Sequence, residues 1–62
     1  MTLELNTRER AIISRLSEDG AVSVANLAKE LGYSEVTIRG DLKLLEEKGW
    51  INRTRGGAAP AL

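Results

Sequence analysis

The fold of this chain is decided by one stretch, which runs Gly32-Tyr33-Ser34-Glu35-Val36-Thr37-Ile38-Arg39-Gly40-Asp41-Leu42. Gly32 is suited to end a preceding helix in a left-handed conformation, because it has no Cβ. Ser34 is suited to cap the next helix, because its hydroxyl accepts a hydrogen bond from an otherwise free backbone amide. Ile38, Leu42 and Leu45 then recur at the spacing of one helix face. The stretch therefore predicts a tight turn followed by an amphipathic helix.

The opposite side of this predicted helix carries a methyl-bearing residue and two cations. Because successive residues are separated by about 100° around a helix, Val36, Arg39 and Lys43 fall roughly opposite the apolar side. A helix that begins at a capped turn and presents cations outward is suited to enter the major groove of DNA.

The composition limits what else the chain can be. Its 62 residues allow one small domain, with a core built mainly from aliphatic side chains since Tyr33 and Trp50 are the only aromatics. There is no cysteine and no histidine, so the common zinc ligands and the commonest general base are missing. We expect no metal site, no cofactor and no enzymatic activity. No apolar run approaches the roughly 20 residues of a membrane span, and no secretory signal is present, so we expect a cytoplasmic protein without a membrane partner.

The net charge is zero, from nine basic and nine acidic residues, which by itself argues against a nucleic-acid-binding domain. The charges are nevertheless segregated along the chain. Cations gather at Arg39 and Lys43 and again at Arg53 and Arg55, whereas acids gather at 18–19, 30 and 46–47. We expect the pairs 18–19 and 46–47 to be solvated and turned away from DNA. A segregated surface can attract phosphate on one side without a net positive charge.

The remaining chain predicts two more helices and a small hairpin. Asn6 and Glu9 have the spacing of a capping box, and Ser23 is suited to cap a second helix. Gly56-Gly57 supplies the positive φ that a tight turn requires. The expected elements are a helix at about 7–19, a minimal strand at 21–23, a helix at 24–31, a helix from 34 to about 48, and a β-prone segment at 50–53 that begins a hairpin.

This order of elements predicts a mainly α fold, a winged helix-turn-helix with three helices and a short β-hairpin wing. The helix-turn-helix would occupy about 22–41 within a domain at 7–58. Residues 1–6 would form a lead-in, and 59–62 a fraying tail or the start of a truncated linker.

Several motifs occur together at a specific spacing. They are Arg8 with Ile12 and Leu16, then Val22-Ser23-Val24, Leu27-Ala28 and Leu31, then Ser34 to Arg39 with Asp41-Leu42, Leu45-Glu46 and Gly49, and finally Arg53-Thr54-Arg55-Gly56-Gly57-Ala58. On these residues the chain resembles the DNA-binding domain of DeoR-type bacterial transcription regulators. The similarity extends over about 7–58.

The resemblance implies a sequence-specific domain that binds double-stranded DNA, in a repressor of carbohydrate or metabolite genes. Such regulators carry a larger C-terminal domain that binds an effector and oligomerises. This chain lacks that domain, so we expect a monomer here and an oligomer in a full-length protein. Two positions depart from the family pattern. Gly40 stands where a second basic residue is usual, and Arg55 stands where histidine is frequent.

The candidate DNA-binding residues are Ser34, Val36, Thr37, Arg39, Gly40, Lys43, Arg53 and Arg55. Arg39 would donate two hydrogen bonds to a guanine edge, the alternative being a surface ion pair with Glu35. Ser34 and Thr37 would cap the helix and position it on a phosphate, and Lys43 would meet phosphate rather than base. Val36 would touch a thymine methyl or lie partly buried.

The hairpin arginines alternate along the expected strand, so Arg53 and Arg55 would point to the same side, toward phosphates or the minor groove. The alternative is that they merely keep the hairpin edge soluble. Asp41 is predicted to be structural and to pair with Arg10 or Arg15. Trp50 is predicted to pack over the helix ends rather than stack on an unpaired base.

A second class of function stays open at this stage. Neutral net charge and Gly40 favour a winged-helix module that binds proteins or regulates without contacting DNA.

Overall fold

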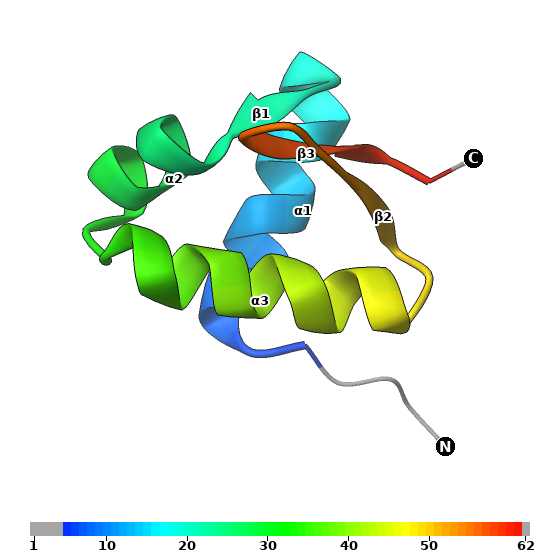
Figure 1. The fold of residues 1–62 in the computed structure, drawn as a ribbon, viewed down its shortest axis with the longest axis horizontal. Helices are drawn as coiled ribbons and strands as arrows, with labels where there is room; N and C mark the ends of the chain where they lie inside the picture. The colour runs from blue at the N-terminus through cyan, green and yellow to red at the C-terminus, as the bar shows by residue number, and fades with distance from the viewer. Residues whose placement is uncertain (1–4, 62) are drawn as a thin grey trace.

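The helices of the computed structural model, which describes residues 5–61, begin at the predicted cap residues (Figure 1). The Asn6 side chain accepts from the Glu9 amide at 2.7 Å, and the Glu9 carboxylate accepts from the Asn6 amide at 3.0 Å, completing a capping box. Ser23 and Ser34 each accept from a backbone amide three residues ahead. The elements are α1 (Thr7–Asp19), β1 (Val22–Ser23), α2 (Val24–Leu31), α3 (Glu35–Glu47), β2 (Ile51–Thr54) and β3 (Gly57–Pro60).

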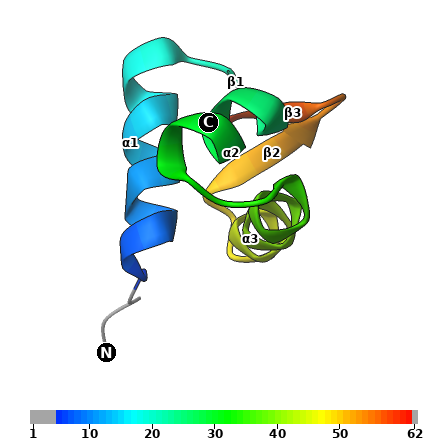
Figure 2. The ribbon, with the colours of Figure 1, turned by 90° about the vertical axis from the view of Figure 1, so that its left-hand side faces the viewer.

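Three helices pack around one aliphatic core, as the sequence predicts. Helix α1 crosses behind α3 in Figure 1, and Figure 2 looks along α3, with α2 and the sheet between it and the upper part of α1. All the core side chains are aliphatic; they are Ile12, Leu16, Val24, Leu27, Ala28, Ile38, Leu42, Leu45, Ile51 and Ala58. Trp50 does not join them, because 37% of its surface is exposed. The winged helix-turn-helix prediction is confirmed, and α3 ends at Glu47, one residue earlier than expected.

The hairpin is larger than the sequence suggests because it belongs to a three-stranded antiparallel sheet. The strand order is β1-β3-β2, so β3 is central and β2 is an edge. Ala59 pairs with Asn52 and Pro60 pairs with Ile51, which places both residues in β3 rather than in a fraying tail. Leu62, the end of that predicted tail, and residues 1–4 of the predicted lead-in lie outside the described residues.

The two glycines at the hairpin turn serve different purposes. Gly56 has a φ of +77° and makes the turn, whereas Gly57 has no positive φ, so the prediction that both supply one is wrong for Gly57. Gly57 is required for another reason: a Cβ there would lie 1.8 Å from the carbonyl oxygen of Val22. The close approach lets β1 pair with β3, with Val22 opposite Ala58 and Ser23 opposite Gly57.

Two ion pairs join the start of α1 to α3. Arg8 donates from Nε and Nη2 to the two carboxylate oxygens of Asp41, with Nη2 2.9 Å from Oδ1. The buried carboxylate of Glu9 lies 3.7 Å from Nζ of Lys48 at the end of α3. Asp41 is thus structural, as predicted, but its partner is Arg8.

The predicted partners of Asp41 point elsewhere. Arg8 shares the inner side of α1 with Ile12, one turn away, whereas Arg10 is rotated outward and donates to the Leu5 carbonyl at 3.2 Å. Arg15 lies near the other end of α1, where it pairs with Glu30 of α2 at 3.0 Å.

No helix in residues 5–61 is both long and apolar enough to cross a membrane.

Two glycine substitutions test this account of the chain. Gly57→Ala should lower the free energy of unfolding by about 1–3 kcal/mol, because the new methyl group forces β1 away from β3. Gly40→Ala is the matched control. It places the same methyl group on α3, where nothing lies within 4 Å, and should raise the free energy of unfolding by about 0.5–1 kcal/mol. Urea unfolding followed by circular dichroism measures both. A Gly57→Ala domain as stable as wild type would contradict the close approach.

Candidate nucleic-acid interface

One side of α3 is open to solvent along its length, and the predicted contact residues of this helix lie on it. Val36 is 76% exposed, and Arg39, Gly40 and Lys43 are also exposed. On the other side Ile38, Leu42 and Leu45 are fully buried. The helical wheel drawn from the sequence is therefore correct, and the partly buried alternative for Val36 is excluded.

The N-terminus of α3 is closed by its own hydroxyl groups. The Ser34 Oγ accepts from the Thr37 amide at 3.1 Å and donates to the Thr37 Oγ1 at 3.0 Å. This arrangement satisfies the cap without using the remaining amides of the first turn, which carry the positive end of the helix dipole. The capping role predicted for Ser34 is confirmed, while a phosphate contact stays a prediction.

Arg39 forms the ion pair that was the alternative to base contact. Its Nη2 lies 3.0 Å from Oε1 of Glu35, one helical turn earlier, and the two side chains are 61% and 48% exposed. An exposed pair at this spacing contributes only about 0.3–0.5 kcal/mol. The pair therefore orients the guanidinium on the open side of α3 and is weak enough to be exchanged for a stronger partner.

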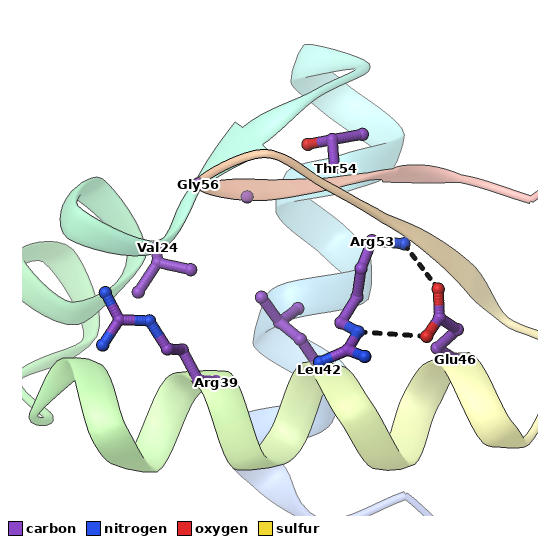
Figure 3. Close-up of a pocket in the computed structure, with 8 residues that line it drawn as sticks. Val24, Arg39, Leu42, Glu46, Arg53, Thr54 and Gly56 are labelled. Atoms are coloured by element: carbon purple, nitrogen blue, oxygen red, sulfur yellow. Dashed lines mark hydrogen bonds and ion pairs between the residues drawn. The ribbon is translucent and has the colours of Figure 1, made fainter.

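A cleft separates α3 from the hairpin. Its volume is about 380 Å³, and it is drawn in Figure 3. Arg39 extends from the α3 wall and Arg53 from the β2 wall, so the two guanidinium groups enter from opposite sides. The other lining residues are Val24, Leu42, Glu46, Thr54, Gly56 and Gly57.

The two hairpin arginines do not alternate along one strand. Strand β2 ends at Thr54, so Arg55 lies with Gly56 in the turn. The turn is held against the start of α2, because the Gly56 carbonyl accepts from the amide of Val24, the first residue of that helix, at 2.8 Å. The prediction that Arg53 and Arg55 lie on the same strand is therefore wrong. Both residues are exposed at the hairpin next to α3, and their DNA contacts stay predictions.

Glu46 is the residue of this surface that the sequence analysis missed. It was expected to be a solvated acid turned away from the site, but its carboxylate accepts from the Arg53 amide at 2.9 Å and from the Arg53 Nε at 3.0 Å. The backbone hydrogen bond, and then the side-chain bond, lower the pKa of Glu46 below its ordinary value. The signal in the sequence is only that Glu46 and Arg53 carry opposite charges and lie a few residues before and after Gly49.

The lowered pKa of Glu46 sets a pH dependence. Because the folded-state pKa lies below the unfolded one, the carboxylate stabilises the fold above the ordinary glutamate pKa of about 4.3, and this contribution is lost as pH falls through the folded value. Between pH 6 and the acid range, wild type should lose more unfolding free energy than Glu46→Gln. Thermal unfolding at matched pH values measures the difference. Parallel pH profiles for the two proteins would contradict the assignment.

Comparison with known proteins places this chain in a family. The model of the DeoR-like helix-turn-helix domain matches residues 8–61. The HTH-type transcriptional regulator GlpR of Haloferax volcanii is 47% identical over 53 residues, covering 86% of this chain and 21% of the relative. A putative galactitol utilization operon repressor of Escherichia coli K12 is 46% identical over 59 residues, covering 95% of this chain and 53% of the relative.

A further relative has a name that indicates the opposite sense of regulation. The L-fucose operon activator of Haemophilus influenzae is 41% identical over 54 residues, covering 87% of this chain and 22% of that protein. No solved structure gives a significant match. The chain therefore spans between about a fifth and about half of the length of these relatives. It belongs to the DeoR family of transcriptional regulators, in which it is a DNA-binding helix-turn-helix domain and not an enzyme.

Proposed function

We propose that this domain recognises a double-stranded operator by placing residues 34–43 in the major groove and residues 53–55 on the adjacent backbone. The observation that carries the proposal is the common placement of the two cationic segments. Arg39 of α3 and Arg53 of the hairpin line one cleft, so a single duplex can contact both segments (Figure 3). A protein-interaction module without DNA contact is not favoured, because the family match covers nearly the whole chain.

Within the proposed contact, the residues divide by role. Arg39 selects guanine through two hydrogen bonds to O6 and N7, exchanging Glu35 for the base, and Val36 meets a thymine methyl. Lys43, Arg53 and Arg55 neutralise phosphates, while the Ser34 and Thr37 cap sets the first turn of α3 against the backbone. Log affinity should therefore fall with log salt, at a slope near −0.9 for each phosphate that a cation neutralises.

Gly40 has a separate role in this proposal. It lies on the open side of α3, and a Cβ there would have nothing within 4 Å in the free domain. Glycine is therefore not required by the fold at this position. Its lack of a side chain lets the α3 backbone approach a DNA surface closely, at the cost of the cation that the family pattern would supply here.

The biological assignment follows the relatives. We propose repression of carbohydrate or metabolite genes, because the Escherichia coli relative that matches 95% of this chain is named a putative galactitol utilization operon repressor. Cytoplasmic action on DNA, and oligomerisation through a C-terminal effector domain, are part of the same proposal. A dimer would place two copies of α3 on half-sites about one helical turn apart, and one copy alone should bind weakly.

Two substitutions on α3 test the proposed roles. A duplex is first selected from random sequences by the domain fused to a dimeriser. Arg39→Ala should weaken binding to this duplex by about 1–3 kcal/mol and leave binding to unrelated duplexes little changed, because it removes base contacts. Lys43→Ala should weaken all duplexes alike and reduce the salt slope by about 0.9, because it removes one phosphate contact.

Fluorescence anisotropy over a range of salt concentrations measures both variants. Equal losses from the two variants on every duplex would exclude base recognition by Arg39. Failure to enrich any sequence would overturn the proposed function.

A further inference from the structure

The carboxylate of Glu46 joins the hairpin to α3 from within the cleft. Strand β2 is the edge of the sheet, and the amide of Arg53 points away from β3 toward α3. Glu46 Oε2 accepts from this amide at 2.9 Å, while its Oε1 accepts from the Nε of the same residue at 3.0 Å. One carboxylate therefore holds both the backbone and the side chain of Arg53 (Figure 3).

This contact leaves part of the Arg53 guanidinium available. A guanidinium carries five N–H donors in a planar arrangement, and Glu46 takes only the one on Nε. Within residues 5–61, no acceptor binds the Nη1 or Nη2 group of Arg53. The side chain is held at one edge while its outer donors stay free. An arginine fixed in this way loses less side-chain freedom on binding than a mobile one.

The Nη donors of Arg53 lie within the cleft between α3 and the hairpin (Figure 3). Arg39 enters the same cleft from α3, and Thr54 and the Gly56-Gly57 backbone complete the hairpin wall. The side chains of Arg53 and Glu46 are 47% and 38% exposed, so the group is reachable from outside. An anion entering between α3 and the hairpin meets the donors of Arg53 without having to reorganise the hairpin.

We propose that Glu46 is a positioning residue for DNA binding, which fixes Arg53 so that its Nη groups receive a backbone phosphate at the cleft. The inference rests on the proposed function. It adds Glu46 to the DNA-binding surface, although a negatively charged residue is not suited to contact DNA directly. A carboxylate beside a duplex repels phosphate, so its presence on this face requires a compensating gain. The gain is the orientation of Arg53.

The sign of a charge-neutralising substitution separates positioning from simple electrostatics. Glu46→Gln removes a negative charge close to the DNA, and electrostatics alone would tighten binding. Positioning predicts the opposite. In the wild type each carboxylate oxygen accepts from a different Arg53 donor, whereas in glutamine an amide nitrogen, which donates, replaces one of these two acceptors. We expect Glu46→Gln to bind the selected duplex about three- to tenfold more weakly, the loss typical of one net hydrogen bond.

Glu47→Gln is the matched control. It makes the same charge change on the same turn of α3, at an exposed residue that forms no hydrogen bond or ion pair with the hairpin within residues 5–61. The Glu47→Gln variant should bind the selected duplex as tightly as wild type, or up to about twofold more tightly. Glu46→Ala, which removes both acceptors, should bind at least as weakly as Glu46→Gln. Circular dichroism at the assay temperature verifies that all variants are folded.

A double-mutant cycle with Arg53→Ala identifies the route of the effect. In the Arg53→Ala background, Glu46→Gln should no longer weaken binding, because the side chain that it positions is gone. The salt slope of Glu46→Gln should fall toward that of Arg53→Ala, a change that loss of stability alone would not produce.

Two failures are distinguishable. If wild type binds and Glu46→Gln binds as tightly as Glu47→Gln, or if its loss persists in the Arg53→Ala background, the positioning role is wrong and the proposed function stands. If wild type binds no duplex at low salt, both fail.

Discussion

One partly buried ion pair, between Arg8 at the start of α1 and Asp41 in the middle of α3, joins the two helices that cross in this fold (Figure 1). Asp41 is 5% exposed, and a buried carboxylate without a partner would destabilise the fold strongly. Arg8 neutralises it with two donors, and this hydrogen bonding raises the pKa of Arg8 further above its ordinary value. The same guanidinium lies 5.0 Å from the ring of Tyr33, in the turn that precedes α3. One arginine thereby joins α1, the turn and α3, and its pair with Asp41 lies on the same inner side of α3 as the buried Ile38, Leu42 and Leu45. Arg39 and Gly40, which immediately precede Asp41 in the sequence, lie on the opposite, solvent-exposed side of α3.

The charges of the outward side explain how a chain with no net charge can have a DNA-binding surface. Two arginines at this surface, Arg39 of α3 and Arg53 of β2, are paired with glutamates of α3. Arg39 pairs with Glu35, and Arg53 pairs with Glu46. These pairs are exposed, so they contribute little to stability and much to side-chain orientation. The cations are therefore held on one face before any ligand arrives, while the inner side of α3 is occupied by aliphatic residues and Asp41.

Features determined within a few residues of the chain were predictable from the sequence, and features determined by packing were not. The caps at Asn6, Ser23 and Ser34 and the apolar face of α3 depend on spacings of three or four residues, and all were found as expected.

The partner of Asp41 lies 33 residues away, and choosing Arg8 over Arg10 or Arg15 requires knowing where α1 crosses α3. The position of Arg55 depends on the start of α2, where the Val24 amide donates to the Gly56 carbonyl of the hairpin turn. Glu46 looked like a solvated acid, because nothing local shows that an edge strand returns past the end of α3. The contacts of the candidate site with DNA involve a second molecule, so they stay predictions.

The most direct test of the account is a nuclear magnetic resonance titration of the isotopically labelled domain with duplex DNA at low and moderate salt. If α3 and the hairpin form one DNA-binding face, the amide shift changes will concentrate at 34–43 and 53–55 and weaken together as salt rises. Changes spread evenly over the domain, or concentrated on α1 away from α3, would contradict the account.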